Sequence, residues 1–279
     1  MLKSIIMKKI LALILAVATV FCFASCGKQE TKEADVKTSA PAADTGNKDS
    51  DADYIVNKGT LVIGVTDYEP MNYKENGEWT GFDTEFAQAV AEKLGVKAEF
   101  KEIEWDNKIM ELNSKALDSV WNGMTLTDEV KNGMECSKPY VINAQVVVMA
   151  KDKVDNYKEV SDLKDLSFVA EAGSAGEKAI TEAGYECTAV QTQADALMEV
   201  SAGAADACVI DITMAKAMTG EGTSYASLKE GIALTSEEYG IGFRKGSNMA
   251  EKVNQIIDEL KADGTLEALA KKYDLTLAE

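Results

Sequence analysis

The sequence predicts an α/β protein built on open β-sheets. From residue 54 onward, short runs rich in β-branched residues alternate with stretches whose apolar residues recur at helical spacing. This alternation is typical of sheets covered by helices. The expected strands are 60–65, 98–103, 119–121, 145–149, 167–170, 187–190, 207–210 and 239–244, and the expected helices are 83–94, 107–112, 177–183, 194–202, 249–262 and 265–273. A length of 279 residues leaves room for two compact domains.

The first residues have the pattern of an export signal. Lys3, Lys8 and Lys9 give a positive start, whether the chain begins at Met1 or at Met7, and an apolar run over 10–23 follows. Such a run suits the apolar region of a signal peptide and is too short to span a bilayer well. We therefore predict a signal peptide over residues 1–25.

The end of this signal carries a possible lipid anchor. The stretch Phe23-Ala24-Ser25-Cys26-Gly27 resembles a lipobox, with Phe23 where Leu is more usual. The resemblance implies cleavage before Cys26 and attachment of a palmitate-bearing diacylglyceryl group to its thiol. An ordinary signal peptide followed by a chance cysteine is the alternative. We expect an extracytoplasmic protein that is lipid-anchored to the cell membrane.

Residues 26–53 are predicted to form the lipidated start and a disordered tether. They contain no aromatic residue after the lipobox and are rich in Lys, Glu, Asp, Thr, Ser and Ala. This composition cannot bury enough apolar surface to offset the chain entropy lost on folding.

Cysteine usage leaves the redox state open. Beyond the anchor the chain has Cys136, Cys187 and Cys208, and an odd number cannot pair fully within one chain. Cys187 and Cys208 both fall in expected strands. We favour buried free thiols, with a disulfide between these two as the alternative.

Composition excludes several classes of function. There is no histidine, which removes Ser-His and Cys-His catalysis and every His-ligated metal site, and no cofactor or metal is expected. The formal net charge of -18 disfavours nucleic acid and anionic membrane surfaces as partners. Arg244 is the only arginine, so any site that needs a guanidinium fork must use it.

Two positions of the second half are candidate ligand contacts. The turn Gly173-Ser174-Ala175-Gly176 leads from an expected strand into an expected helix, and such a helix start can bind a carboxylate or phosphate. No Gly-Lys-Ser/Thr follows, so it is not a phosphate-binding loop, and a plain turn with a helix cap is an equal alternative. Asp211 follows the strand 207–210 at its carboxyl end, where open α/β sheets place ligands.

Several motifs, in order, resemble those of a known family. They are Thr66-Asp67-Tyr68-Glu69-Pro70-Met71-Asn72-Tyr73, Gly81-Phe82-Asp83, Trp121-Asn122-Gly123-Met124-Thr125-Leu126-Thr127-Asp128-Glu129, Cys136-Ser137-Lys138-Pro139-Tyr140, Asp206-Ala207-Cys208-Val209-Ile210-Asp211 and Tyr239-Gly240-Ile241-Gly242-Phe243-Arg244-Lys245. Together they look like the family 3 solute-binding proteins of bacterial polar amino-acid ABC transporters. The resemblance covers residues 60–273.

The resemblance implies a two-lobed, type II periplasmic-binding-protein fold of the venus-flytrap kind. Two crossing strands would join the lobes, and closure of the lobes would bury a small ligand. The first lobe would comprise 54–149 and 237–279, and the second 150–236. The protein would act as a monomer that delivers its ligand to an ABC permease and ATPase.

The same resemblance assigns the ligand contacts. Asp211, the Gly123 backbone and Thr125, with Met124 between them, would hold an amino group. N–H groups at Ser174 and Ala175 would meet a carboxylate.

Three further residues complete the predicted site. Tyr68 would cover the ligand's side chain, and Trp121 and Asp67 are further predicted ligand contacts. From the residues alone, Asp211 could instead cap a helix, and Tyr68 and Trp121 could belong to the core. Asp67, Glu69, Asp83 and Glu171 favour a cationic ligand, although Asp83 is also placed to cap its helix.

One position departs from the family pattern. The family usually reads Thr-x-Glu-Arg, and that arginine binds the ligand's carboxylate, but Val130 stands at its place. The ligand could be an amino acid held by the glycine-rich turn and a lysine, a compound without a free α-carboxylate, or a molecule bound in another orientation. Two other functions on the same fold are alternatives to a component of an importer: a ligand-sensing receptor and a dehydratase-like enzyme. The lack of histidine disfavours the enzyme.

Overall fold

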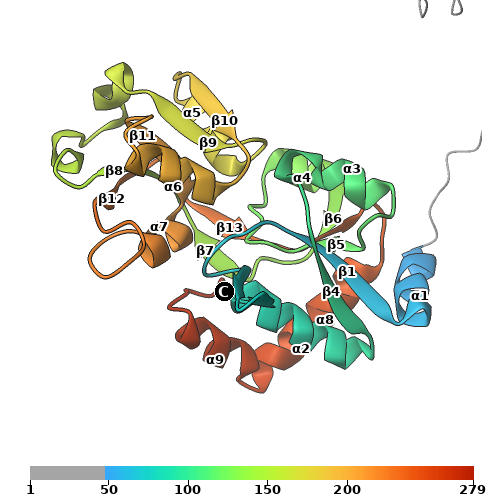
Figure 1. Ribbon diagram of the computed structural model, residues 1–279. Helices are drawn as coiled ribbons and strands as arrows, with labels where there is room; N and C mark the ends of the chain where they lie inside the picture. Colours follow the sequence, from blue (N-terminus) through green and yellow to red (C-terminus); the bar gives the residue numbers. More distant parts are fainter. Residues whose placement is uncertain (1–47) are drawn as a thin grey trace, which may run out of the picture. The chain divides into compact units, whose positions relative to one another are not determined.

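The computed structural model describes residues 48–279, and Figure 1 shows them as two α/β lobes. The predicted signal peptide, Cys26 and most of the predicted tether lie outside the described residues. The first lobe contains a five-stranded sheet in the order β4-β1-β5-β14-β6. Its strands are β1 Thr60–Val65, β4 Lys97–Glu102, β5 Ser119–Val120, β6 Met134–Cys136 and β14 Gly242–Arg244. The strands β4, β1 and β5 run parallel, and β14 is antiparallel to β5 and β6.

Helices cover both faces of this sheet, and strand β1 is apolar on both faces. Leu61, Ile63 and Val65 of β1 pack into the core on the side of α2, α8 and α9, whereas Val62 packs into the opposite cluster with residues of α3 and α4. The helices are α2 Phe82–Leu94, α3 Lys108–Asn113, α4 Asp128–Gly133, α8 Met249–Ala262 and α9 Thr265–Lys272. Alternate side chains of a strand point to opposite faces, so one strand serves two cores.

The second lobe repeats this arrangement around a sheet in the order β10-β9-β11-β8-β12. Its strands are β8 Gln145–Ala150, β9 Phe168–Glu171, β10 Cys187–Val190, β11 Ala207–Asp211 and β12 Leu228–Ala233. Its helices are α5 Ala175–Glu182, α6 Gln193–Ser201 and α7 Ile212–Met218. The strands β10, β9 and β11 are parallel, so their carboxyl ends meet at one edge of the sheet.

Two antiparallel strands connect the lobes, as the family resemblance implied. They are β7 Val141–Asn143 and β13 Glu237–Tyr239, which pair Asn143 with Glu237 and lie between the two sheets (Figure 1). The expected strand 239–244 is thus two strands, because Gly240 and Ile241 separate β13 from β14. The predicted lobe boundary after residue 149 put β8 in the first lobe, but β8 pairs with β11 and β12 of the second sheet.

Smaller elements fill the connections. The strands β2 Tyr73–Glu75 and β3 Glu78–Thr80 form a hairpin, and short 3-10 helices occupy Trp105–Asn107, Val154–Asn156 and Val160–Asp165. Cys136, Cys187 and Cys208 are free, so the alternative of a disulfide between the last two is not realised. No helix among residues 48–279 has the length and apolarity needed to cross a membrane.

The helix α1 Lys48–Lys58 was not expected from the sequence, which predicted a disordered tether as far as residue 53. Tertiary contacts explain it. Ile55 is fully buried in the main core, and Asp51 pairs with Arg244, whose Nη2 lies 2.6 Å from Asp51 Oδ1. Arg244 also bonds the Leu117 carbonyl and the buried Asp118 carboxylate, so the only arginine of the chain fastens α1 to the first sheet.

Candidate binding site

A cavity of about 400 Å³ lies between the two lobes. The first lobe contributes Trp105, Lys108, Asn122, Gly123, Met124, Thr125, Thr127, Glu129 and Val130, and the second contributes Glu171, Gly173, Ser174, Ala175, Glu177, Lys178, Thr181, Gln193 and Asp211. The lobes touch at its rim, where Lys108 Nζ donates to the Gly173 carbonyl (2.9 Å) and Gln191 Nε2 to Glu104 Oε1 (2.5 Å). The lobes are therefore in contact at this rim, and the cavity has the size of a small-molecule site.

Asp211 ends β11 and is held by neutral donors. Its Oδ1 accepts hydrogen bonds from Gln145 Nε2 (2.7 Å), Tyr239 Oη (2.8 Å) and Asn143 Nδ2, and its Oδ2 accepts one from Gln193 Nε2 (2.6 Å). Asp211 occupies the N-cap position of α7, but its side chain makes no capping bond. Burial raises its pKa to about 7, and the nearby Glu237 carboxylate acts in the same direction. No cation among the described residues forms a salt bridge with this carboxylate, so a ligand ammonium would find it unpaired.

The glycine-rich turn leads into α5 as the sequence predicted. Ser174 is the N-cap, and its Oγ accepts a hydrogen bond from the Glu177 backbone N–H (3.1 Å). The Gly173 N–H is taken by Glu177 Oε2 (2.7 Å), and the Ser174 N–H by the Glu171 carbonyl (3.1 Å). The backbone N–H groups of Ala175 and Gly176 make no hydrogen bond to any other residue that the structure describes.

Gly176 is required by packing against the neighbouring strand. A Cβ atom at this position would lie 2.5 Å from the Val209 carbonyl oxygen. The start of α5 therefore lies directly against β11, close to the end of the strand that carries Asp211. A helix start in this place can receive an anionic group next to Asp211.

The segment Gly123–Thr125 forms part of the opposite wall. Gly123 has φ of 54°, and its N–H donates to Asp83 Oδ2 (2.6 Å), which also accepts a hydrogen bond from Tyr140 Oη (2.9 Å). Asp83 therefore fixes this segment and does not cap α2, whose N-cap is Gly81. Burial raises the pKa of Asp83 to about 7, although these hydrogen bonds lower it. Thr125 Oγ1 donates to Glu237 Oε1 (2.7 Å), so it links the wall to the crossing strand β13.

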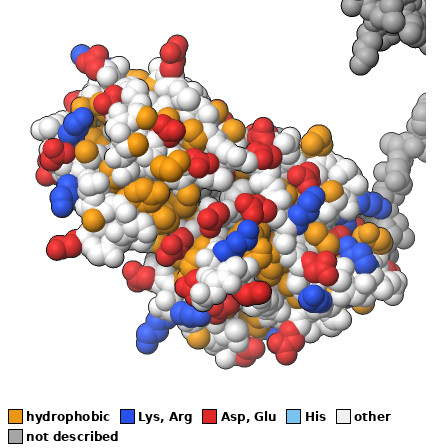
Figure 2. Space-filling view, in the orientation of Figure 1, with side chains coloured by type: hydrophobic (Ala, Val, Ile, Leu, Met, Phe, Trp, Pro, Cys, Tyr) orange, Lys and Arg blue, Asp and Glu red, His pale blue; other side chains and the backbone are white. Residues whose placement is uncertain are grey.

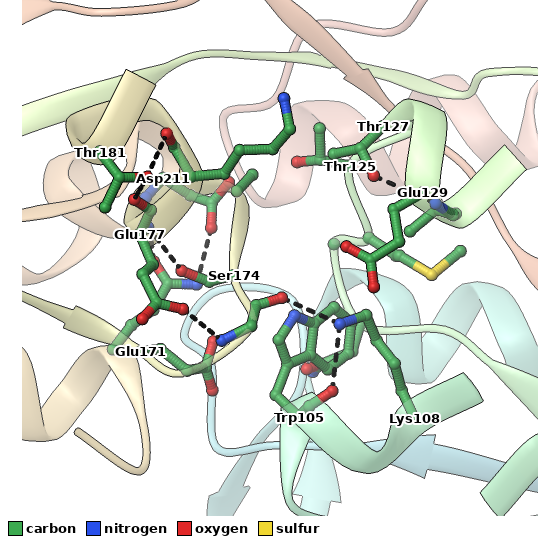
Figure 3. A pocket seen from close by; sticks show the side chains of 18 residues that line it. Trp105, Lys108, Thr125, Thr127, Glu129, Glu171, Ser174, Glu177, Thr181 and Asp211 are labelled. Atoms are coloured by element: carbon green, nitrogen blue, oxygen red, sulfur yellow. Dashed lines mark hydrogen bonds between the residues drawn. The ribbon is translucent and has the colours of Figure 1, made fainter. Parts of the chain in front are cut away.

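The predicted contacts divide into two groups. Gly123, Met124, Thr125, Ser174, Ala175 and Asp211 line the cavity together. Figure 3 shows Thr125, Ser174 and Asp211 around it. Asp67, Tyr68 and Trp121 lie outside its lining. Asp67 is exposed, whereas Tyr68 and Trp121 are buried in the core.

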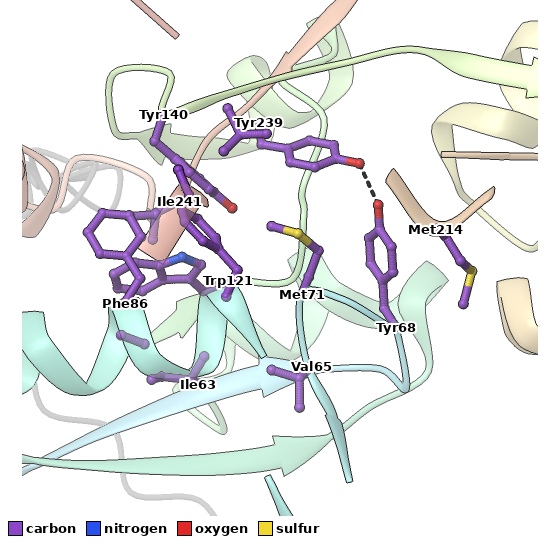
Figure 4. Close-up of a cluster of buried hydrophobic side chains, with 14 of the residues drawn as sticks. Ile63, Val65, Tyr68, Met71, Phe86, Trp121, Tyr140, Met214, Tyr239 and Ile241 are labelled. Atoms are coloured by element: carbon purple, nitrogen blue, oxygen red, sulfur yellow. Dashed lines mark hydrogen bonds between the residues drawn. The ribbon is translucent and has the colours of Figure 1, made fainter. Parts of the chain in front are cut away.

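Their packing shows why these two aromatic side chains are in the core. Tyr68 Oη lies 2.5 Å from both Thr213 Oγ1 and Tyr239 Oη, so its hydroxyl joins the first lobe to α7 and to β13. Figure 4 shows the hydrogen bond between Tyr68 and Tyr239. Trp121 packs edge-on against Phe86 with ring centroids 4.9 Å apart. In the core, each aromatic ring removes more of its surface from water than it would on the wall of a solvent-filled cavity.

Several lining residues were not predicted, chief among them Trp105 and Lys108. Both follow the carboxyl end of β4, a parallel strand of the first sheet, and that position was the signal available in the sequence. The Lys108 ammonium lies 4.8 Å from the centre of the Trp105 ring and bonds the Trp105 carbonyl at 3.1 Å. Lys108 is almost fully buried, and burial lowers its pKa.

Val130 lies on the cavity wall, as expected for the position where the family pattern has an arginine. It belongs to α4, and its N–H is capped by Thr127 Oγ1 at 3.2 Å. Its side chain packs into the apolar cluster of the first lobe. Arg244 is occupied in fastening α1, so within residues 48–279 no guanidinium reaches the cavity.

Comparisons with known proteins agree with this geometry. Residues 61–276 match the family described as bacterial extracellular solute-binding proteins, family 3. The chain is 31% identical over 221 residues to the L-cystine-binding protein TcyJ of Escherichia coli (strain K12), which covers 77% of this chain and 83% of that protein. It is 32% identical to the L-cystine-binding protein TcyA of Bacillus subtilis (strain 168), over 96% of this chain and 97% of that one.

A solved structure of an ancestral arginine-binding protein bound to arginine is also similar. It has a TM-score of 0.72 and 35% identity, and the match covers 77% of this chain and 98% of that one. The two-lobed fold predicted from the motifs is therefore confirmed. The relatives named here are described as binding proteins.

The carboxyl group of Asp83 should make stability depend on pH. Because its pKa is raised in the folded state, the folded protein holds a proton that the unfolded chain loses above about pH 4. Stability should therefore fall as pH rises from about 4 to 7, by up to about 1.4 kcal/mol per pH unit for this group. We expect Asp83→Asn to reduce the slope of unfolding free energy against pH, measured by urea denaturation.

The exposed Asp152→Asn serves as the control for a change of surface charge. Asp211 shifts in the same direction and remains in both variants, so some slope should persist in Asp83→Asn. Parallel curves for the wild type and Asp83→Asn would contradict the role given to Asp83.

Proposed function

We propose that this chain, which belongs to the bacterial extracellular solute-binding proteins of family 3, captures a small amino-bearing solute outside the cytoplasm and presents it to an ABC importer. The observation that carries this proposal is the cavity between the lobes with Asp211 on its wall, since a buried carboxylate that only neutral groups bond would gain from pairing with a cation. The relatives named for binding cystine and arginine support a solute of amino-acid size.

The surroundings of Asp211 suit an ammonium group better than a neutral ligand. Asn143 and Gln145 donate to both Asp211 and Glu237, so the two carboxylates share these amides and increase the negative potential at the second lobe. An ammonium placed against Asp211 would be paired with a charge and desolvated when the lobes close. Closure would then be driven by an interaction that is complete only in the bound state.

The test is a binding panel with a variant at Asp211. Thermal-shift and calorimetric measurements with the common L-amino acids, L-cystine, putrescine and butylamine should find compounds that stabilise the protein by mass action. Asp211→Asn should weaken every amine that binds at least about a hundredfold, because removing one partner of a buried pair costs about 3–5 kcal/mol. Asp206→Asn, at the residue just before the start of the same strand, is the control. Unchanged affinity in Asp211→Asn would remove this assignment.

The carboxylate side of the site is weaker than the ammonium side. A guanidinium fork would supply two charged hydrogen bonds, each worth about 1.5–3 kcal/mol, and Val130 supplies none. The start of α5 could replace part of this, because a helix N-terminus contributes about 0.3–1 kcal/mol and up to about 2 when partly buried. Lys108 could act as a point charge from the first lobe, although two carbonyl oxygens already accept from its ammonium. We propose that binding depends little on an α-carboxylate.

Val130→Arg should reverse this preference. The wild type should bind an α-amino acid and its α-amide, such as L-lysine and L-lysinamide, with similar affinity or bind both weakly. The arginine variant should bind at least one free amino acid about tenfold tighter than its amide, since it restores a charged partner for the carboxylate. Val130→Met controls for the longer side chain, and calorimetry is the measurement. Nanomolar wild-type binding of a standard amino acid that is lost on amidation would contradict this proposal.

The membrane anchor is a separate part of the proposal. The motif around Cys26 supports a lipoprotein whose tether lets the lobes reach the permease. Cys26→Ala should move the protein from the membrane fraction to the soluble fraction and abolish metabolic labelling with palmitate, while Cys136→Ala should do neither. Retention of Cys26→Ala in the membrane with unchanged labelling would rule the anchor out.

A further inference from the structure

A second carboxylate stands at the same edge of the second sheet as Asp211. Glu171 is the last residue of β9, which runs parallel to β11, and it lines the cavity. It is only 2% exposed. In Figure 3, Glu171 and Asp211 come from the same lobe, whereas Trp105, Lys108 and Glu129 lie across the cavity from them.

Glu171 has no partner of its own. Neither carboxylate oxygen accepts a hydrogen bond from any of residues 48–279, and Oε1 is fully buried. Asp211 differs in this respect, because four neutral donors bond its two oxygens. A buried carboxylate without donors is costly unless something outside the chain compensates it.

The nearby lysine does not fill this need. Lys108 lies close enough to lower the pKa of Glu171, yet burial and the Asp211 carboxylate outweigh it and raise that pKa well above its ordinary value. The Lys108 ammonium donates to the carbonyls of Trp105 and Gly173, and it forms no salt bridge with Glu171. Lys108 therefore serves the contact between the lobes, and the Glu171 carboxyl group is left without a partner among the described residues of the cavity lining.

We propose that Glu171 is a second cation-binding residue, so that the cavity selects solutes with two positively charged nitrogen atoms. This inference rests on the proposed function, because it takes the first nitrogen to be the one held by Asp211. The remaining charges of the lining fit it: Glu129 and Glu177 add negative charge, and Lys178 is the other basic residue. A diamine or a diamino acid has the required chemistry.

The experiment compares matched pairs of probes that differ by one amino group. L-Lysine is paired with L-norleucine, and putrescine with butylamine, and affinities are measured by calorimetry near pH 7.5. The wild type should bind the diamino member of at least one pair about tenfold tighter or more, and Glu171→Gln should lower that ratio to about one. Asp211→Asn should weaken both members of a pair together. Glu186→Gln, an exposed acid of the same lobe, is the control and should keep the ratio.

Glu171→Gln should fold about as stably as the wild type, since it keeps the shape of the side chain and removes a carboxyl group whose charged form burial disfavours. Glu171→Leu is a second variant in case the first does not fold. The affinity ratio is measured on whichever variant unfolds cooperatively on heating. Equal wild-type affinity for both members of each pair would overturn the role of Glu171 but leave the amino-bearing solute in place. An affinity ratio that is unchanged in the variant would also overturn the role of Glu171. This result is expected if Glu171 stays a neutral acid and pairs with no ligand cation. Failure of every amine to bind would overturn both proposals.

Discussion

The buried hydrogen-bond network around Asp211 is the interaction on which the rest of the site depends. Its donors come from the crossing strand β7, from the start of β8 and from β13, through Asn143, Gln145 and Tyr239. Asn143 and Gln145 also bond Glu237 of β13, and Thr125 of the first lobe bonds the same carboxylate. Asp211, the residue that we propose binds a ligand, is thus connected to both connecting strands. Under that proposal, a charge bound at Asp211 would act on the segments that join the two lobes.

The network is polar but contains no cation of its own. Neutral amides and hydroxyls orient the Asp211 carboxylate without cancelling its charge, and its pKa of about 7 reflects the burial that remains uncompensated. A lysine or arginine in place of one amide would have satisfied the carboxylate permanently and removed the reason for a ligand to bind. Binding proteins therefore gain from leaving a buried group incompletely satisfied, at some cost in the stability of the empty protein.

The sequence predicted the parts of the site that depend on strand ends. Asp211 and the Ser174 turn could be placed because the carboxyl end of a parallel strand and the start of a helix are local features. Tyr68 and Trp121 could not be assigned to core or cavity, because that depends on partners such as Thr213 and Phe86, which are distant in the sequence. Trp105 and Lys108 were missed for a related reason: Lys108 gains its place through Gly173 of the other lobe.

The same distinction holds for the fold. Strand β1 and helix α8 match their predicted bounds, since their apolar periodicity alone determines them. Helix α1 was taken for tether because its composition is polar, and only the pairing of Asp51 with Arg244 and the burial of Ile55 show why it forms. The lobe boundary was misplaced by one strand, because pairing of β8 with β11 rather than with the first sheet leaves no trace in the residues of β8 itself.

The two lobes contribute different chemistry to the cavity. The second lobe presents Asp211 and Glu171 at one sheet edge, with the start of α5 beside them, so polar recognition is concentrated on one side. The first lobe contributes the apolar Trp105, Met124 and Val130 together with the charged Lys108 and Glu129, and the hydroxyl of Thr125 is already bonded to Glu237. An arginine at position 130 would have made recognition two-sided, with opposite charges supplied by opposite lobes. With valine there, and with the Lys108 ammonium already bonded to two carbonyl oxygens, no guanidinium from the described residues faces the cavity. Under the proposed function, the first lobe would then act mainly by excluding water, which strengthens charge pairing at the second lobe.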